Sequence, residues 1–171
     1  MPRLYRLFGL VSLCALAAAC GPSGTSSAPP EQAAAPSAAA PAPEAAPTAP
    51  TAAQQAALAA LPAPYNTADL DNGRAKFALC MACHTIIPGA PNTVGPNLNG
   101  VVGRKAGTLA GYSYSDAMKK ADWTWDPQHL DTWLSGPMKM VPGTKMTFAG
   151  LPSAKDRIDV IGYLTAAAAG S

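Results

Sequence analysis

The run Cys80-Met81-Ala82-Cys83-His84 constrains this chain more than any other feature. Two cysteines separated by two residues and followed at once by a histidine form the C-x-x-C-H pattern that attaches a c-type haem. The order suits that chemistry, because each thiol adds to one vinyl group of the ring and the adjacent histidine can reach the iron. The run occurs once in the chain, so we expect one covalently attached haem c.

Other interpretations of this run are a thioredoxin-like redox pair, half of a zinc site, or chance. A redox pair does not need the histidine and sits in a βαβ pattern, which the sequence lacks. A zinc site takes four ligands, and the only other histidine is His129. We therefore predict that Cys80 and Cys83 attach the haem and that His84 is an axial ligand of the iron.

Residues 1–20 have the organisation of a secretory signal. Arg3 and Arg6 precede a short apolar run, and that run is shorter than the roughly 20 apolar residues of a spanning helix. The run Leu16–Cys20 is similar to a bacterial lipobox, although Ala17 stands where leucine is usual. We predict acylation of Cys20, which has no partner cysteine once the signal is removed; the alternative is ordinary cleavage at Ala15-Leu16-Ala17 and a soluble periplasmic protein.

Composition divides the rest of the chain into two parts. Residues 21–64 consist mainly of Ala, Pro, Ser and Thr, and such a segment buries too little apolar area to offset its ordering entropy. We predict a disordered tether over residues 21–64, with at most a short helix near Thr51–Leu61, and a folded domain over residues 65–171. The formal net charge of +2 gives no sign of nucleic-acid binding.

The apolar spacing in the domain predicts helices and no strands. A first helix capped by Asn66 or Thr67 carries the haem motif. A second begins at Asp126-Pro127 and ends at Ser135-Gly136-Pro137. A last helix begins at Ser153.

Taken together, the domain resembles the class I cytochromes c of the mitochondrial and bacterial c2 kind over about Asp69 to Ala166. The residues that carry the resemblance are Gly73, Phe77, Cys80-x-x-Cys83-His84, Gly95-Pro96-Asn97-Leu98, Gly103-Arg104-Lys105, Tyr112-Ser113-Tyr114, Trp125, Pro142-Gly143-Thr144-Lys145-Met146 and Tyr163-Leu164. The resemblance implies a small all-α class I cytochrome c fold around one haem, with one-electron transfer as its function.

The resemblance also implies roles for single residues. The backbone oxygen of Pro96 should accept a hydrogen bond from His84. Arg104, Tyr114 and Trp125 should hold the haem propionates, and Thr144 should support either a propionate or the loop of Met146. The residues alone leave the second axial ligand open among Met138, Met140 and Met146, with His129 as a further alternative. The match at Pro142–Met146 selects Met146.

Two positions depart from the family pattern. Trp133 stands where many members have a tyrosine near the methionine sulfur, and Met118 stands where many have an asparagine. Because both positions lose a polar group of the family pattern, we expect a drier distal pocket. Lys105, Lys139 and Lys145 should lie in loops around the exposed haem edge and attract an acidic partner surface.

These expectations describe an electron carrier and not an enzyme, because His/Met ligation leaves no open iron position for a substrate. We expect a monomer on the periplasmic side of a bacterial envelope, held at the membrane by lipid or by the signal. It would carry electrons from a quinol-oxidising complex to a terminal oxidase or other acceptor in a respiratory or photosynthetic chain. The alternatives are a fixed subunit of an oxidase complex and, less in keeping with the Met146 motif, a peroxidase-like domain.

Overall fold

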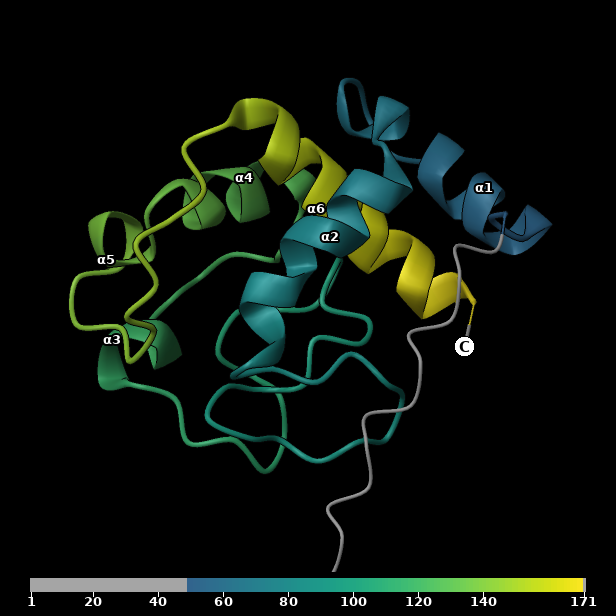
Figure 1. Ribbon diagram of the computed structural model, residues 1–171. Helices are drawn as coiled ribbons and strands as arrows, with labels where there is room; N and C mark the ends of the chain where they lie inside the picture. Colours follow the sequence, from purple (N-terminus) through teal and green to yellow (C-terminus); the bar gives the residue numbers. More distant parts are fainter. Residues whose placement is uncertain (1–48, 171) are drawn as a thin grey trace, which may run out of the picture. The chain divides into compact units, whose positions relative to one another are not determined.

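The computed structural model describes residues 49–170. The predicted signal, Cys20 and the predicted tether up to residue 48 lie outside this range. The described helices are α1 (Ala52–Ala59), the 3₁₀ turn η1 (Tyr65–Thr67), α2 (Leu70–Met81), α3 (Asp116–Lys119), α4 (Pro127–Ser135), α5 (Pro137–Met140) and α6 (Ala154–Ala169). Between residues 49 and 170 the only β pairing is the isolated bridge Lys105–Thr124, so the predicted all-α fold is confirmed (Figure 1).

Helices α2 and α6 pack closely together, in the middle of the molecule (Figure 1). Gly73 of α2 makes the close approach possible, because a side chain there would overlap the backbone carbonyl of Asp159. Phe77 is 1% exposed, and its ring lies 5.4 Å from that of Tyr163. Burying a phenylalanine side chain stabilises the fold by about 1.5–3 kcal/mol. The predicted contact of Gly73 and Phe77 with the last helix is therefore present.

A buried carboxylate fastens the start of α2 to α6. Asp159 of α6 is 1% exposed. Its Oδ1 accepts from the backbone N–H of Asp69 at 2.9 Å, and its Oδ2 accepts from Asn72 Nδ2 at 2.6 Å and from Lys155 Nζ at 2.5 Å. Burial by itself would raise the pKa of this carboxyl, but the hydrogen bonds from Lys155, Asp69 and Asn72 together hold it below its usual value.

The helix starts differ from the prediction at one place. Asp69, and not Asn66 or Thr67, is the N-cap of α2, because its side chain accepts from the N–H groups of Asp71 and Asn72. The expected cap residues lie instead in η1. The predicted starts of α4 and α6 are confirmed, since the side chains of Asp126 and Ser153 cap them.

The sequence did not predict α3 or α5. Each has only four residues, too few to show a helical period. Ser115 caps α3 through the N–H of Met118, and Pro137 begins α5 directly after α4.

The predicted start of the domain at residue 65 is too late. Helix α1 precedes it and packs on α6, so within residues 49–170 the packed part of the chain includes a helix before residue 65. The helix has a capping box in which Thr51 and Gln54 bond each other's backbone. An alanine-rich segment forms a helix here because α6 gives its apolar side a surface to cover, which composition cannot reveal.

None of the helices within residues 49–170 combines the length and the apolar character needed to cross a membrane.

Candidate cofactor site

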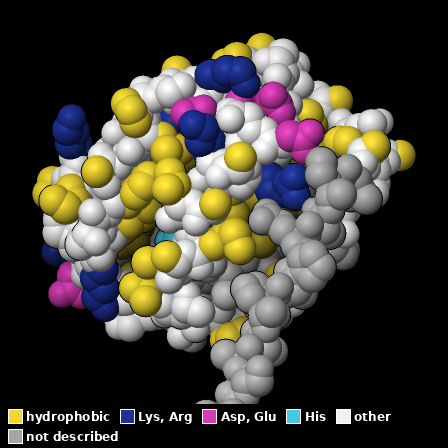
Figure 2. All heavy atoms as spheres, in the orientation of Figure 1, with side chains coloured by type: hydrophobic (Ala, Val, Ile, Leu, Met, Phe, Trp, Pro, Cys, Tyr) yellow, Lys and Arg dark blue, Asp and Glu magenta, His cyan; other side chains and the backbone are white. Residues whose placement is uncertain are grey.

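One face of the folded domain holds a cavity of about 340 Å³ whose lining is mostly apolar. Figure 2 shows it as a hollow walled by hydrophobic side chains. The lining includes all ten residues predicted to contact the cofactor: Cys80, Cys83, His84, Pro96, Arg104, Tyr114, Trp125, Trp133, Thr144 and Met146. The fold thus brings together residues that lie up to 66 positions apart, from Cys80 to Met146.

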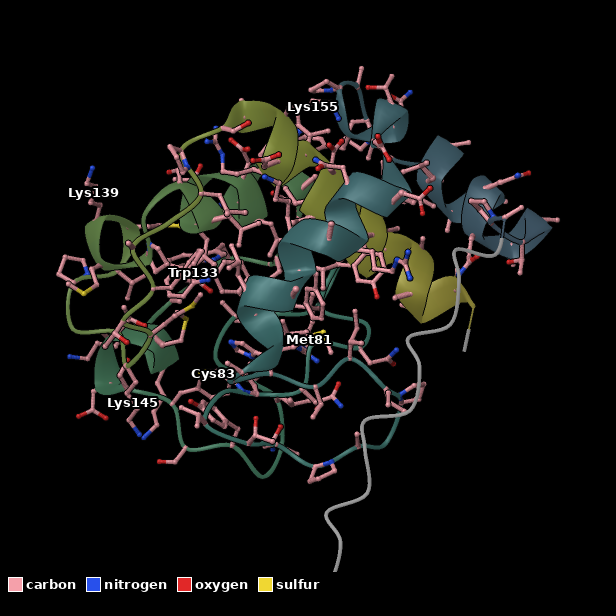
Figure 3. All side chains as sticks on the ribbon, viewed as in Figure 1. Met81, Cys83, Trp133, Lys139, Lys145 and Lys155 are labelled. Carbon is pink, nitrogen blue, oxygen red and sulfur yellow. The ribbon has the colours of Figure 1, made fainter. Side chains whose placement is uncertain are left out.

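The end of α2 presents the cysteines and the histidine to this cavity. The N–H of Cys83 and the N–H of His84 both donate to the carbonyl of Cys80, at 3.0 and 2.9 Å. The helical turn therefore continues through the motif and sets the spacing of the three side chains. Cys83 and Met81 lie at the end of α2 in Figure 3.

Two backbone neighbours fix the His84 ring. Its Nδ1 lies 2.7 Å from the carbonyl oxygen of Pro96, so Nδ1–H donates and the lone pair of Nε2 is free for a metal. Gly95 lies against the ring, because a Cβ at that position would come within 2.6 Å of Nδ1. Burial lowers the pKa of His84, which the Pro96 carbonyl only partly opposes. The ring is thus neutral at pH 7, as a metal ligand must be.

The state of the thiols argues against a redox pair. Burial, and then the neighbouring Cys83, raises the pKa of Cys80 to about 11. Redox-active cysteines have lowered pKa values, because the thiolate is the reactive form. The zinc alternative has no support within residues 49–170, where no group of three or more His, Cys, Asp or Glu side chains could hold a metal ion.

The loop between α5 and α6 brings a thioether to the same cavity. The hydroxyl of Thr144 accepts from the N–H of Met146 at 3.2 Å, which holds the loop as one of the two predicted roles of Thr144 requires. Met138 is 58% exposed, and neither it nor Met140 lines the cavity. The second methionine at the cavity is Met118, which is 5% exposed and had been singled out only as a departure from the family pattern.

His129 is not part of the site. It belongs to α4 and does not line the cavity. Its Nδ1 lies 2.8 Å from Oδ2 of Asp126, and its ring stacks on Trp123 with centroids 5.8 Å apart. The bis-histidine alternative therefore has no geometric support.

The polar side chains of the cavity are held by backbone hydrogen bonds. Arg104 donates to the carbonyls of Asn97 and Asn99 at 3.0 and 3.3 Å, which leaves guanidinium donors for a further acceptor. The backbones of Arg104 and Trp125 are bonded to each other, with the N–H of Trp125 donating at 2.8 Å. Burial raises the pKa of Tyr114, so its hydroxyl is protonated and can donate. Trp133, on α4, packs against Trp125 with centroids 5.3 Å apart.

Sequence reasoning missed the rim of the cavity. Leu79 and Val94 line it and are 61% and 74% exposed, and Met81 between the two cysteines is 65% exposed. The hydroxyl of Tyr112 donates to the carbonyl of Val94 at 2.9 Å and so joins two loops at this edge. The signal available in the sequence was the apolar character of Leu79 and Met81, which lie beside and inside the cysteine motif.

The three lysines expected around the edge differ in their surroundings. Lys105 forms an ion pair with Asp122 at 2.8 Å and does not line the cavity. Lys145 lines it, with Nζ donating to the carbonyl of Ser113 at 2.6 Å. Lys139 lies on α5, and Figure 3 shows both Lys139 and Lys145 at the outer edge of the molecule. Of the three, only Lys145 lines the cavity, so a ring of lysines around the haem edge stays a prediction.

The residues present fit a covalently held haem. Two cysteines, a neutral imidazole with a free Nε2 and a thioether surround one mostly apolar cavity, and Arg104 and Tyr114 add polar donors. A haem propionate buried beside these two donors would have a hydrogen-bond partner, as a buried carboxylate requires.

Comparisons with known proteins point to the same cofactor. No family model matches the chain. Cytochrome c2 of Rhodoblastus acidophilus is 52% identical over 97 residues, which are 57% of this chain and 91% of that protein. Cytochrome c of Kluyveromyces lactis is 46% identical over 105 residues, 61% of this chain and 96% of the relative. A protein named cytochrome c-type cyt cy from Rhodobacter capsulatus is 50% identical over 99 residues, 57% of this chain but 49% of the relative.

A solved structure gives the same answer for the fold. Cytochrome cH from Methylobacterium extorquens is similar with a TM-score of 0.53 and 49% identity, over 56% of this chain and 96% of that one. The chain is about half identical to several cytochromes over nearly their whole length, and the cavity has the residues that a haem c needs. These two findings establish the family. The chain belongs to the class I cytochrome c family, electron carriers with one covalently bound haem c.

Proposed function

We propose that Cys80 and Cys83 form the two thioether bonds and that Nε2 of His84 and the sulfur of Met146 are the axial ligands of the haem iron. The support is that all four side chains line one cavity and that the tautomer of His84 leaves Nε2 free. Arg104, Tyr114 and Trp125 are the residues that would hold the propionates, since each lines the same cavity and carries an N–H or O–H donor.

The bound haem supplies a reversible one-electron couple. The residues around the cavity influence the reduction potential of that couple. Trp133, Met118 and Phe77 line the cavity and are at most 8% exposed, so they exclude water and favour the less charged state of the site. A soft thioether ligand acts in the same direction. If His84 and Met146 both held the iron, they would leave no position for a substrate, and we assign no catalytic residue.

In the cell, the protein would carry single electrons from a quinol-oxidising complex to a terminal oxidase or another acceptor of a bacterial respiratory or photosynthetic chain. It would work on the periplasmic side, attached to the membrane through acylated Cys20. Support comes from the signal-like residues 1–20, from the cysteine at position 20 and from the names of the relatives, which include cytochrome c2 and cyt cy.

The observation that carries this proposal is the enclosure of the C-x-x-C-H motif and Met146 in one largely apolar cavity. A deletion strain tests it: membranes without this protein should lose a large part of quinol-dependent oxygen uptake, and added wild-type protein should restore it. A redox titration should fit a single one-electron transition. Full activity of the deletion membranes would contradict the carrier role.

Mild detergent extraction distinguishes a mobile carrier from a fixed subunit. A carrier separates from the oxidase on a sizing column, whereas a subunit co-elutes with it in fixed ratio. Rapid binding of cyanide by the native protein would favour the peroxidase-like alternative.

A further inference from the structure

Helix α1 covers one face of α6 through a single side. Its less exposed residues are Gln54, Ala57 and Leu58, followed by Leu61 just beyond its end. These positions follow the i, i+3, i+4, i+7 spacing of one helix face. The other α1 residues are exposed, so this one side makes the contact.

The opposing surface of α6 is shaped for that contact. A Cβ at Gly162 would lie 3.1 Å from Cδ1 of Leu58 and would overlap the side chain of Ala68. A Cβ at Gly170 would come within 2.6 Å of Nε2 of Gln54. Glycine inside a helix costs about 1 kcal/mol relative to alanine. At Gly162 that cost has a structural reason, because Leu58 and Ala68 occupy the space of a side chain.

This surface faces away from the cofactor cavity. Val160 and Leu164 of α6 line the cavity. At 100° per residue, Gly162 points about 160° away from both of them. Helix α6 therefore separates α1 from the cavity, and Figure 1 shows α1 along the part of α6 remote from α4 and α5.

The direction of α1 sets where the preceding chain leaves the domain. Leu58 lies at Gly162 and Gln54 lies at Gly170, so the two helices run antiparallel. The start of α1 lies beside the C-terminal end of α6.

We propose that α1 is a clasp that fixes the exit of the N-terminal segment at the C-terminal end of α6, behind the cofactor cavity. Attachment through the N-terminus then leaves the cavity rim open to a redox partner. The consequence for electron transfer rests on the proposed membrane attachment; the position of the exit does not.

Release of α1 has a calculable effect. An isolated helix of this length is unstable in water, so an undocked α1 would melt. The fourteen residues from Thr51 to Pro64 would then join the tether and add up to about 43 Å at 3.1 Å per residue. Effective concentration falls with roughly the −3/2 power of linker length, so a tether lengthened from about 30 to about 44 residues lowers it about twofold.

Cross-linking of the full-length holoprotein tests the exit. Exposed Ala53 is replaced by cysteine (Ala53→Cys) and labelled with a short photoactivatable cross-linker. We expect cross-links to the peptide that contains residues 162–170, and their dispersal when Leu58→Ser is added. Ala56→Ser introduces the same residue on the exposed side of α1 and should change nothing. Cross-links from Ala53→Cys to peptides of the rim residues Leu79 or Val94 would overturn the proposal.

Native membranes test the consequence for electron transfer. Leu58→Ser should slow oxidation of the membrane-bound cytochrome about twofold, as the tether length predicts, while oxidation by ferricyanide and the optical spectrum stay unchanged. An unchanged rate in membranes, with the cross-links dispersed, would refute the role of the clasp in electron transfer. If the wild-type protein proves soluble, the membrane attachment fails, whereas the cross-links still decide where the chain leaves the domain.

Discussion

Nδ1 of His84 lies 2.7 Å from the carbonyl oxygen of Pro96, twelve residues further along the chain. This hydrogen bond holds the imidazole in one orientation and one tautomer, and Gly95 leaves room for the ring. A second partner of this kind raises the basicity of a ligating histidine. The contact also joins the end of α2 to the loop that follows it.

The first prediction concerns haem attachment. In Cys80→Ala only one thioether bond can form, so we expect a lower yield of holoprotein with an altered ferrous spectrum. The haem of the wild-type protein should stay with the chain on a denaturing gel stained for haem. Met81→Ala, between the two cysteines and largely exposed, is the matched control and should keep both bonds. Loss of haem from the wild-type chain on that gel would contradict the covalent assignment.

The second prediction concerns the iron ligand Met146. Met146→Ala should abolish the weak charge-transfer band of ferric iron–methionine ligation, admit cyanide rapidly and lower the reduction potential, because a soft thioether favours ferrous iron. Met138→Ala, at an exposed position, should keep the band. Met118→Leu tests the other methionine at the cavity and should also keep it. Loss of the band in Met118→Leu but not in Met146→Ala would mean that the wrong methionine was chosen.

The third prediction concerns the acid stability that Asp159 provides. Its folded-state pKa is lowered, so its contribution is present above the unfolded-state pKa of about 4 and is lost as the pH falls through the folded-state value. Asp159→Asn should lower the free energy of unfolding at pH 7 by about 1–3 kcal/mol, because the amide turns a donor toward Lys155 or Asn72. It should also flatten the pH dependence below pH 4 in urea titrations.

Asp122→Asn is the control for this measurement. Asp122 pairs with Lys105, but its side chain is 91% exposed, so its removal should leave the free energy of unfolding almost unchanged. An Asp159→Asn protein as stable as the Asp122→Asn protein would show that the α2–α6 contact does not depend on the carboxylate.

The fourth prediction concerns docking of the redox partner. Lys105 already pairs with Asp122, so the charges reversed here are those of Lys139 and Lys145, and the rim near the cysteines is apolar. Reversal of both charges (Lys139→Glu with Lys145→Glu) should slow oxidation of detergent-extracted protein by membranes about tenfold, the low end of the range for electrostatic steering. Ionic strength should have a similar moderate effect, since the Debye length is about 8 Å at physiological salt.

The spectrum of the double variant should match the wild type, which controls for damage to the site. The matched control is Lys119→Glu with Lys120→Glu. It reverses the charges of two exposed lysines at the end of α3 that do not line the cavity. A rate that depends neither on salt nor on Lys139 and Lys145 would show that docking is wholly apolar.

The fifth prediction concerns Cys20. The mature protein should begin at Cys20, and its intact mass should include a diacylglyceryl group. Several chains on one residue give stable anchoring, as a single chain does not. Cys20→Ser should release the cytochrome from membranes with an unchanged spectrum. A soluble wild-type protein that begins at Ala18 would exclude the lipid.

Local sequence patterns were enough to predict the cofactor and the helical fold class. The residues of the C-x-x-C-H run are neighbours in the chain, so their spacing is visible without a structure. The starts of α4 and α6 are set by Asp126 and Ser153, whose side chains accept from the N–H groups three positions further on. Local rules of this kind depend only on neighbouring residues. The selection of Met146 over Met138 and Met140 required the family resemblance, because all three sulfurs lie in the same short segment.

Contacts between residues far apart in the chain became visible in the folded structure and not before. Lys105 forms an ion pair with Asp122, seventeen residues away, and no local pattern distinguishes it from the other exposed lysines. The short helix allowed near Thr51–Leu61 is present as α1, but its packing of Leu58 against Gly162 is a contact across about a hundred residues that an alanine-rich composition does not encode. Helix propensity in so short a segment is too weak to act without a partner surface, and only the folded chain supplies that surface.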